Sequence, residues 1–144
     1  MVKGDKIPDS NHIARFCRPM QAPEGEIQAT AFMLRTDEES LSVNWLEFLK
    51  CSDRASEVRK IQKIYSATFN RVGASARTAI LNVGEVRHKV RTESPDRRNL
   101  EVLHDPIPHS DQSHGAIYNL KHDDELIAEL ILEAVLEDYP AREQ

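Results

Sequence analysis

The chain has 144 residues, of which 40% are hydrophobic and 30% are charged, and its formal net charge is −5. This length suits one domain with a single apolar core, and the composition excludes a disordered chain. No apolar run approaches the roughly 20 residues of a membrane-spanning helix, no secretory signal is present, and the two cysteines form no CxxC pair, so we expect a cytoplasmic protein.

The chain divides into a lead-in, one domain and a tail. The polar range 1–11 is expected to be flexible, 12–140 to form a single domain, and 141–144 to be a C-terminal tail. Alternating apolar and polar side chains predict the first strand over residues 12–17. After a loop with two prolines, the apolar run 29–34 predicts a central strand covered on both faces.

The middle of the chain predicts a strand, a long helix, a second strand and a short helix. Residues 41–45 alternate strictly and give the clearest strand signal. Ser52 or Asp53 is expected to cap a helix that runs to about Phe69, since apolar positions there recur every three or four residues. The apolar run 79–83 predicts a strand, and we expect a short basic helix after it.

The last third of the chain predicts two strands and a helix. Residues 100–104 alternate, and residues 116–118 predict an edge strand. A final helix is expected to begin at residues 123–124 and to stop at Pro140. The apolar band of this helix is wider than packing against one element requires. We therefore expect burial against the sheet and against a second element, for which a second subunit is one candidate. Four glutamates recur at every fourth position, and we expect a nearby cationic group to offset their repulsion.

Charge is distributed unevenly along the chain. Residues 54–98 contain eleven lysines and arginines against four acidic residues, whereas the remainder contains eight basic and twenty acidic residues. This asymmetry indicates either two complementary surfaces of one fold or a surface for an acidic partner. A nucleic acid is one such partner, and the residues that would follow its backbone are Arg59, Lys60, Lys63, Arg87, Lys89 and Arg91. The chain has no recognisable nucleic-acid reader motif, and its overall acidity opposes such binding.

The stretch 103–118 contains three of the six histidines and two prolines. Its candidate ligands for a divalent metal ion are His104, Asp105, His109, Asp111 and His114. Imidazole and carboxylate groups together suit zinc, manganese or iron, but their spacing matches no established zinc motif. Three interpretations therefore remain open: a metal site, a binding or active site without metal, and an ordered polar loop.

A second candidate site joins two segments that are far apart in the sequence. His12 and Arg15 lie on the first strand, and Trp45 and Glu47 lie at the end of the strong strand signal. Arg15 would bind an anion, Trp45 would stack on a base, and His12 or Glu47 would transfer a proton. The alternative is that Trp45 belongs to the core and Arg15 pairs with a surface acid.

These patterns predict an α+β domain in which a small mixed or mostly antiparallel sheet packs against two main helices. The sequence contains no P-loop, dinucleotide-binding fingerprint or serine-hydrolase elbow. The first hypothesis for function is a small binding or accessory protein that contacts a protein or another acidic partner, with homodimerisation through the last helix. The alternative is a metal- or histidine-dependent enzyme acting on a phosphate-bearing substrate, a nucleotide or nucleic acid, in which His12, Arg15 and His114 act as catalytic groups.

Overall fold

In the computed structural model, residues 4–143 are described and form one six-stranded antiparallel sheet with three α-helices. The strands are β1 (His12–Cys17), β2 (Leu41–Trp45), β3 (Arg77–Asn82), β4 (Glu101–His104), β5 (His114–Tyr118) and β6 (Glu137–Pro140). Their order across the sheet is β4-β5-β2-β1-β3-β6, and every pairing is antiparallel. The expected α+β class is confirmed.

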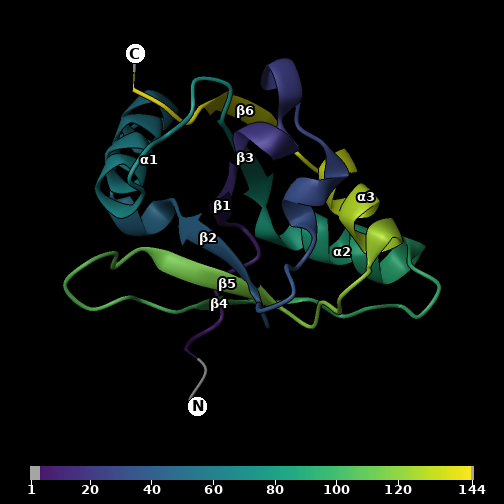
Figure 1. Cartoon of the computed structure of the whole chain (residues 1–144). Helices are drawn as coiled ribbons and strands as arrows, with labels where there is room; N and C mark the ends of the chain where they lie inside the picture. The colour runs from purple at the N-terminus through teal and green to yellow at the C-terminus, as the bar shows by residue number, and fades with distance from the viewer. Residues whose placement is uncertain (1–3, 144) are drawn as a thin grey trace.

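The helices cover both faces of the sheet. They are α1 (Arg54–Thr68), α2 (Val83–Glu93) and α3 (Glu125–Glu133). Figure 1 shows α1 on one side of the sheet and α2 with α3 on the other. Both α1 and α2 begin at side-chain caps, because Asp53 accepts a hydrogen bond from the Ser56 amide and Asn82 accepts one from the Glu85 amide.

Two apolar cores lie on opposite faces of the sheet. The larger core packs Ile13 of β1 against Val86 of α2 and Ile131 of α3. The smaller core packs Ile80 of β3 against Ile61 of α1. Neighbouring residues of β1 contribute to different cores, since successive side chains of a strand point to opposite faces. The pattern of residues 12–17 that predicted this strand therefore belongs to a strand that is buried on both of its faces.

The prediction of a central strand over residues 29–34 is wrong. Ala29–Phe32 form a short 3-10 helix, η3, and Ala31 and Phe32 are buried against the larger core. A short apolar run is compatible with a buried strand and with a buried helical turn, so periodicity alone does not separate them. The helix η3 lies against α3, where it covers part of the larger core.

Two predictions near the C-terminal end also need correction. Residues 114–118 form β5, which lies between β4 and β2 and is not an edge strand. The last helix ends at Glu133, and residues 137–140 pair with β3 as strand β6 instead of continuing the helix. Without β6 the outer edge of β3 would have unpaired backbone groups, and Pro140 is tolerated because β6 is itself an edge strand.

The apolar band of the last helix is largely covered within the chain. Ile127, Leu130 and Ile131 are buried, whereas Leu126 and Leu136 remain 50% and 47% exposed. The sheet, η3 and α2 supply the second element that the width of this band led us to expect.

Part of the expected lead-in contacts the sheet. The side chain of Ile7 is 2% exposed, and its amide donates to the Val102 carbonyl of β4 at 2.9 Å. Ile7 lies over Gly115, where an added Cβ would come within 3.1 Å of the Ile7 side chain. In the expected tail, Ala141 is buried in the smaller core. Residues 1–3 and 144 of these two segments lie outside the described range.

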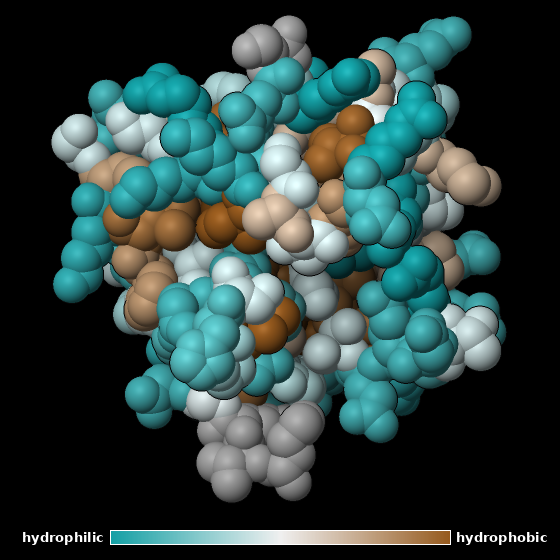
Figure 2. Space-filling view, turned by 60° about the vertical axis from the view of Figure 1, so that its left-hand side comes forward, coloured by the Kyte–Doolittle hydropathy of each residue, from teal (hydrophilic) through white to brown (hydrophobic). Residues whose placement is uncertain are grey.

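The surface in Figure 2 is largely hydrophilic, with apolar side chains gathered in a few separate patches. No helix within residues 4–143 combines the length and apolar character needed to cross a bilayer.

Candidate functional site

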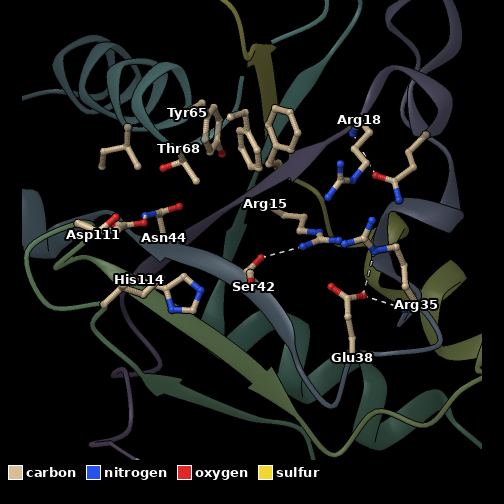
Figure 3. Close-up of a pocket in the computed structure, with 16 residues that line it drawn as sticks. Arg15, Arg18, Arg35, Glu38, Ser42, Asn44, Tyr65, Thr68, Asp111 and His114 are labelled. Carbon is tan, nitrogen blue, oxygen red and sulfur yellow. Dashed lines mark hydrogen bonds and ion pairs between the residues drawn. The ribbon is translucent and has the colours of Figure 1, made fainter. Parts of the chain in front are cut away.

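A pocket of about 230 Å³ opens on the face of the sheet that α1 covers. It is bounded by β1 and β2, by the C-terminal half of α1, and by the loop between β4 and β5. Figure 3 shows arginine side chains gathered at one end, and Asn44, Asp111 and His114 at the other. The two ends therefore differ in the hydrogen-bonding groups that they present.

The pocket exists because β1 and β2 separate. They pair only at Ile13 with Trp45 and at Ala14 with Asn44, although β1 pairs with β3 along its whole length. The side chain of Arg15 occupies the gap beyond the last pair. Its Nη1 donates to the Ser42 carbonyl at 2.9 Å, and its Nε donates to the Ala31 carbonyl at 2.8 Å. Arg15 thus satisfies the Ser42 carbonyl of β2 beside the gap and also binds η3 through the Ala31 carbonyl.

Arg15 is a buried cation without a carboxylate partner. The residue is 8% exposed and forms no ion pair with any residue from 4 to 143. Its remaining nitrogen, Nη2, donates no hydrogen bond to the described chain, and the side chain lines the pocket. Burial lowers the pKa of Arg15, because desolvation penalises the charged form. An anion in the pocket would relieve this penalty. The expectation that Arg15 pairs with a surface acid is not met.

Two further arginines extend the positive end of the pocket. Arg18 is exposed at the end of β1, and Arg35 lies in the loop before β2. The Arg35 Nε lies 3.8 Å from Glu38 Oε1, and this carboxylate also accepts from the Arg35 amide at 2.7 Å. Three arginines line this end beside a single carboxylate, that of Glu38, which pairs with Arg35 alone, so this end carries an excess of two positive charges.

Asn44 and His114 form the opposite end of the pocket. They are register partners on β2 and β5, so their side chains leave the sheet on the same face. The Asn44 Nδ2 donates to Asp111 Oδ2 at 2.8 Å and to Ser113 Oγ at 2.9 Å. Ser113 Oγ donates in turn to Asp111 Oδ1 at 2.9 Å. This closed network holds the Asn44 amide in one orientation.

The predicted set of His12, Arg15, Trp45 and Glu47 is divided by the structure. His12 binds Glu47 through its backbone amide and its Nδ1, each at 2.7 Å. Trp45 donates to Asn11 at 2.8 Å and packs its ring against His104 at a centroid distance of 5.1 Å. These three residues do not line the pocket, so only Arg15 of the set belongs to it.

The His- and Asp-rich stretch does not form a ligand cluster. His104 Nε2 bonds to the Gln112 carbonyl at 2.8 Å, and His114 Nδ1 bonds to the Asp105 carbonyl at 2.7 Å. His109 is exposed at the loop tip and does not line the pocket. Across residues 4–143, no three His, Cys, Asp or Glu side chains converge as metal ligands would. Of the five predicted ligands, Asp111 and His114 line the pocket, and each is hydrogen-bonded to groups of the protein.

The basic residues predicted for nucleic acid do not form one surface. Arg59, Lys60 and Lys63 lie on α1, whereas the other three lie on α2, across the sheet (Figure 1). Two of those on α2 are paired within the chain: Arg87 with Asp9 at 2.7 Å, and Lys89 with Glu133 at 3.1 Å. Lys89 thus supplies the expected cationic partner for one of the four glutamates, Glu133. Arg91 is exposed and distant from the α1 group.

Sequence reasoning missed most of the pocket. Arg18, Arg35, Glu38, Ser42 and Asn44 line it, and none of them was singled out. The one available signal is that Ser42 and Asn44 alternate with the apolar residues of β2, so their side chains had to share a face. No local pattern relates Arg35 to Arg15 and Arg18, because three short 3-10 helices and their connecting loops separate them.

Comparison with models of known protein families, with curated proteins and with solved structures found no match to this chain.

Proposed function

We propose that the protein binds a small phosphate-bearing molecule in the pocket beside Arg15. The observation that carries this proposal is a buried guanidinium that has no carboxylate partner and has one nitrogen free of hydrogen bonds to the described chain. A buried charge of this kind is costly unless it is paired. Binding an anion would provide the missing pairing. This proposal shares an acidic partner with the hypothesis of a binding protein. It shares a phosphate-bearing ligand with the alternative hypothesis of an enzyme.

The charge at the arginine end of the pocket supports phosphate over carboxylate. Arg15, Arg18 and Arg35 outnumber Glu38 by two positive charges, and a phosphate monoester carries nearly two negative charges at pH 7. Guanidinium groups also match phosphate oxygens in geometry, because their nitrogen donors form a planar fork. A single carboxylate would use fewer of these donors and would balance only half of the excess charge.

Calorimetric titration with ribose 5-phosphate and with ribose tests the proposal, since the two probes differ in the phosphate alone. We expect heat of binding for the ester and none for the free sugar. Replacing Arg35 with glutamine should weaken binding of the ester about tenfold or more, because charge-assisted hydrogen bonds are lost. Arg15→Gln should weaken binding of the ester more than Arg35→Gln does. Thermal unfolding and circular dichroism will show whether each variant is folded.

Arg97→Gln is the matched control, because Arg97 is exposed and lies outside the pocket. It removes the same charge and should leave the affinity unchanged. Equal heats for ribose 5-phosphate and ribose would contradict the proposal. So would wild-type affinity in a folded Arg35→Gln protein.

A further inference from the structure

The end of the pocket remote from the arginines presents hydrogen-bond acceptors. Both protons of the Asn44 amide nitrogen are used, by Asp111 and by Ser113. In Figure 3 the amide nitrogen of Asn44 is turned toward Asp111, and its oxygen is turned into the pocket. That oxygen accepts no hydrogen bond from the described chain. Asn44 therefore offers an acceptor in a fixed position.

His114 offers a second acceptor at the same end. A backbone carbonyl can only accept, so the 2.7 Å contact with the Asp105 carbonyl requires a proton on His114 Nδ1. In the neutral imidazole the other nitrogen, Nε2, is then unprotonated and accepts. Nε2 makes no hydrogen bond with residues 4–143, and the side chain lines the pocket.

The walls between the two ends suit a flat ring. Phe16 and Phe69 line the pocket and stack on each other with ring centroids 4.5 Å apart. The ring centroids of Tyr65 and Phe16 are 4.8 Å apart. The Tyr65 hydroxyl is hydrogen-bonded to Thr78 Oγ1 at 2.8 Å, so the Tyr65 ring is held in place. Aromatic rings contact the face of a nucleobase favourably, whichever base it is.

We infer that the ligand is a nucleoside monophosphate whose base carries an exocyclic amino group. This inference rests on the proposed function, because the phosphate is assigned to Arg15, Arg18 and Arg35. The amino group of cytosine or adenine has two protons, and the two acceptors, Asn44 Oδ1 and His114 Nε2, are placed to receive them. Uracil and hypoxanthine have a carbonyl oxygen at the corresponding position and one ring N–H beside it, so they offer the two acceptors one proton where the amino group offers two.

Titration with CMP and UMP tests the inference, because the two nucleotides differ only in the C4 group, amino or carbonyl, and in the proton that N3 carries in UMP. We expect CMP to bind at least about tenfold more tightly than UMP, since UMP would leave one of the two acceptors without a hydrogen-bond donor. AMP should likewise bind more tightly than IMP. Equal affinities within both pairs would overturn the inference, as would ribose 5-phosphate binding as tightly as CMP.

The outcomes separate this inference from the proposed function. If no phosphate ester binds, both fail. If CMP and UMP bind equally and both depend on Arg35, the phosphate site stands and the inference about the base fails.

His114→Ala should reduce the preference for CMP over UMP, and it should weaken the binding of CMP more than that of ribose 5-phosphate. His88→Ala is the matched control, because His88 is exposed on α2 and does not line the pocket. It should keep the wild-type preference. An undiminished preference in a folded His114→Ala protein would remove His114 from the recognition of the base, and with it the two-acceptor arrangement that we infer.

Discussion

Arg15 and Cys17 show how two residues on one side of a strand acquire opposite properties. Both side chains leave β1 on the same face, and both are buried. Arg15 stays near polar groups because β2 has separated from β1, so carbonyl oxygens and the pocket surround its guanidinium. Cys17 lies deeper in the larger core, and burial raises the pKa of its thiol to about 12. One residue is thus available to a ligand, and the other is inert.

The thiol of Cys17 should not react in the folded protein. Only the thiolate is nucleophilic, and at pH 8 a thiol with a pKa of about 12 is almost entirely protonated. We expect an aromatic disulfide reagent to modify one thiol, Cys51, in the native protein and two thiols after unfolding. In the Cys51→Ser variant, native modification should be at least roughly a hundredfold slower than after unfolding. Fast modification of that variant under native conditions would contradict the burial of Cys17.

The short strand β6 depends on contacts that join it to α1. Glu137 accepts a hydrogen bond from Tyr139 on the same strand and one from the Arg54 Nε of α1 at 3.1 Å. These contacts, the Tyr139 hydrogen bond first, lower the pKa of Glu137 from its ordinary value of 4.5. Gln62 of α1 adds a third connection, because its side chain donates to the Pro140 carbonyl at 2.8 Å. The last strand is therefore fastened to both β3 and α1.

The contribution of Glu137 to stability should depend on pH. Its pKa is lower in the folded state, so its contribution is fully present above about pH 4.5 and is lost as the pH falls through the folded pKa. At pH 7, Glu137→Gln should lower the free energy of unfolding by a few tenths to about 1 kcal/mol, since the group is partly exposed. Urea unfolding at pH 7, 5 and 3.5 should show this difference shrinking toward acid.

Glu26→Gln provides the reference for this experiment, because the Glu26 side chain is exposed and makes no hydrogen bond or ion pair within residues 4–143. It should change stability little at any of the three pH values. A deficit in Glu137→Gln that stays constant or grows as the pH falls would show that the carboxylate does not stabilise the fold in this way.

Across the whole molecule, ion pairs connect the basic middle of the sequence with its acidic ends. The pairs are Arg54–Glu137, Arg77–Asp138, Arg87–Asp9, Lys89–Glu133 and Arg98–Asp124. Each pair joins segments that are far apart in the chain or belong to different elements. The charge asymmetry of the sequence is thus used within the fold, as the interpretation with two complementary surfaces predicted. The three arginines of the pocket, Arg15, Arg18 and Arg35, take no part in these five pairs.

The stability of the whole molecule should therefore fall with added salt. Partly exposed ion pairs are screened as the Debye length shortens, and each contributes a few tenths of a kcal/mol or somewhat more. Raising NaCl from 0.02 to about 0.5 M should lower the urea midpoint at pH 7, with a total loss of about 1–2 kcal/mol. The Arg87→Gln variant lacks one of these pairs, so its free energy of unfolding should fall less than that of the wild type when salt is added. A midpoint that rises with salt would contradict this account.

The local pattern of the sequence determined the fold class and most of the elements. The alternation in 12–17 and 41–45, the cap at Asp53 and the short helix after β3 were all predicted, because periodicity and capping act over a few neighbouring residues. The histidine-rich stretch 103–118 was selected as a candidate site, and two of its residues, Asp111 and His114, line the pocket. Composition alone identified these residues as candidates, and it contained no information about their partners.

Only the tertiary structure decided which residues meet. The prediction for 137–140 was wrong because the partner of that segment, the outer edge of β3, lies more than fifty residues earlier in the sequence. The pocket arises from the same kind of cause: β1 and β2 separate after Ala14, which leaves a gap that Arg15 enters and toward which Arg18 and Arg35 converge. Strand pairing and loop closure join distant segments, and the periodicity of a short segment carries no record of the segment against which it packs.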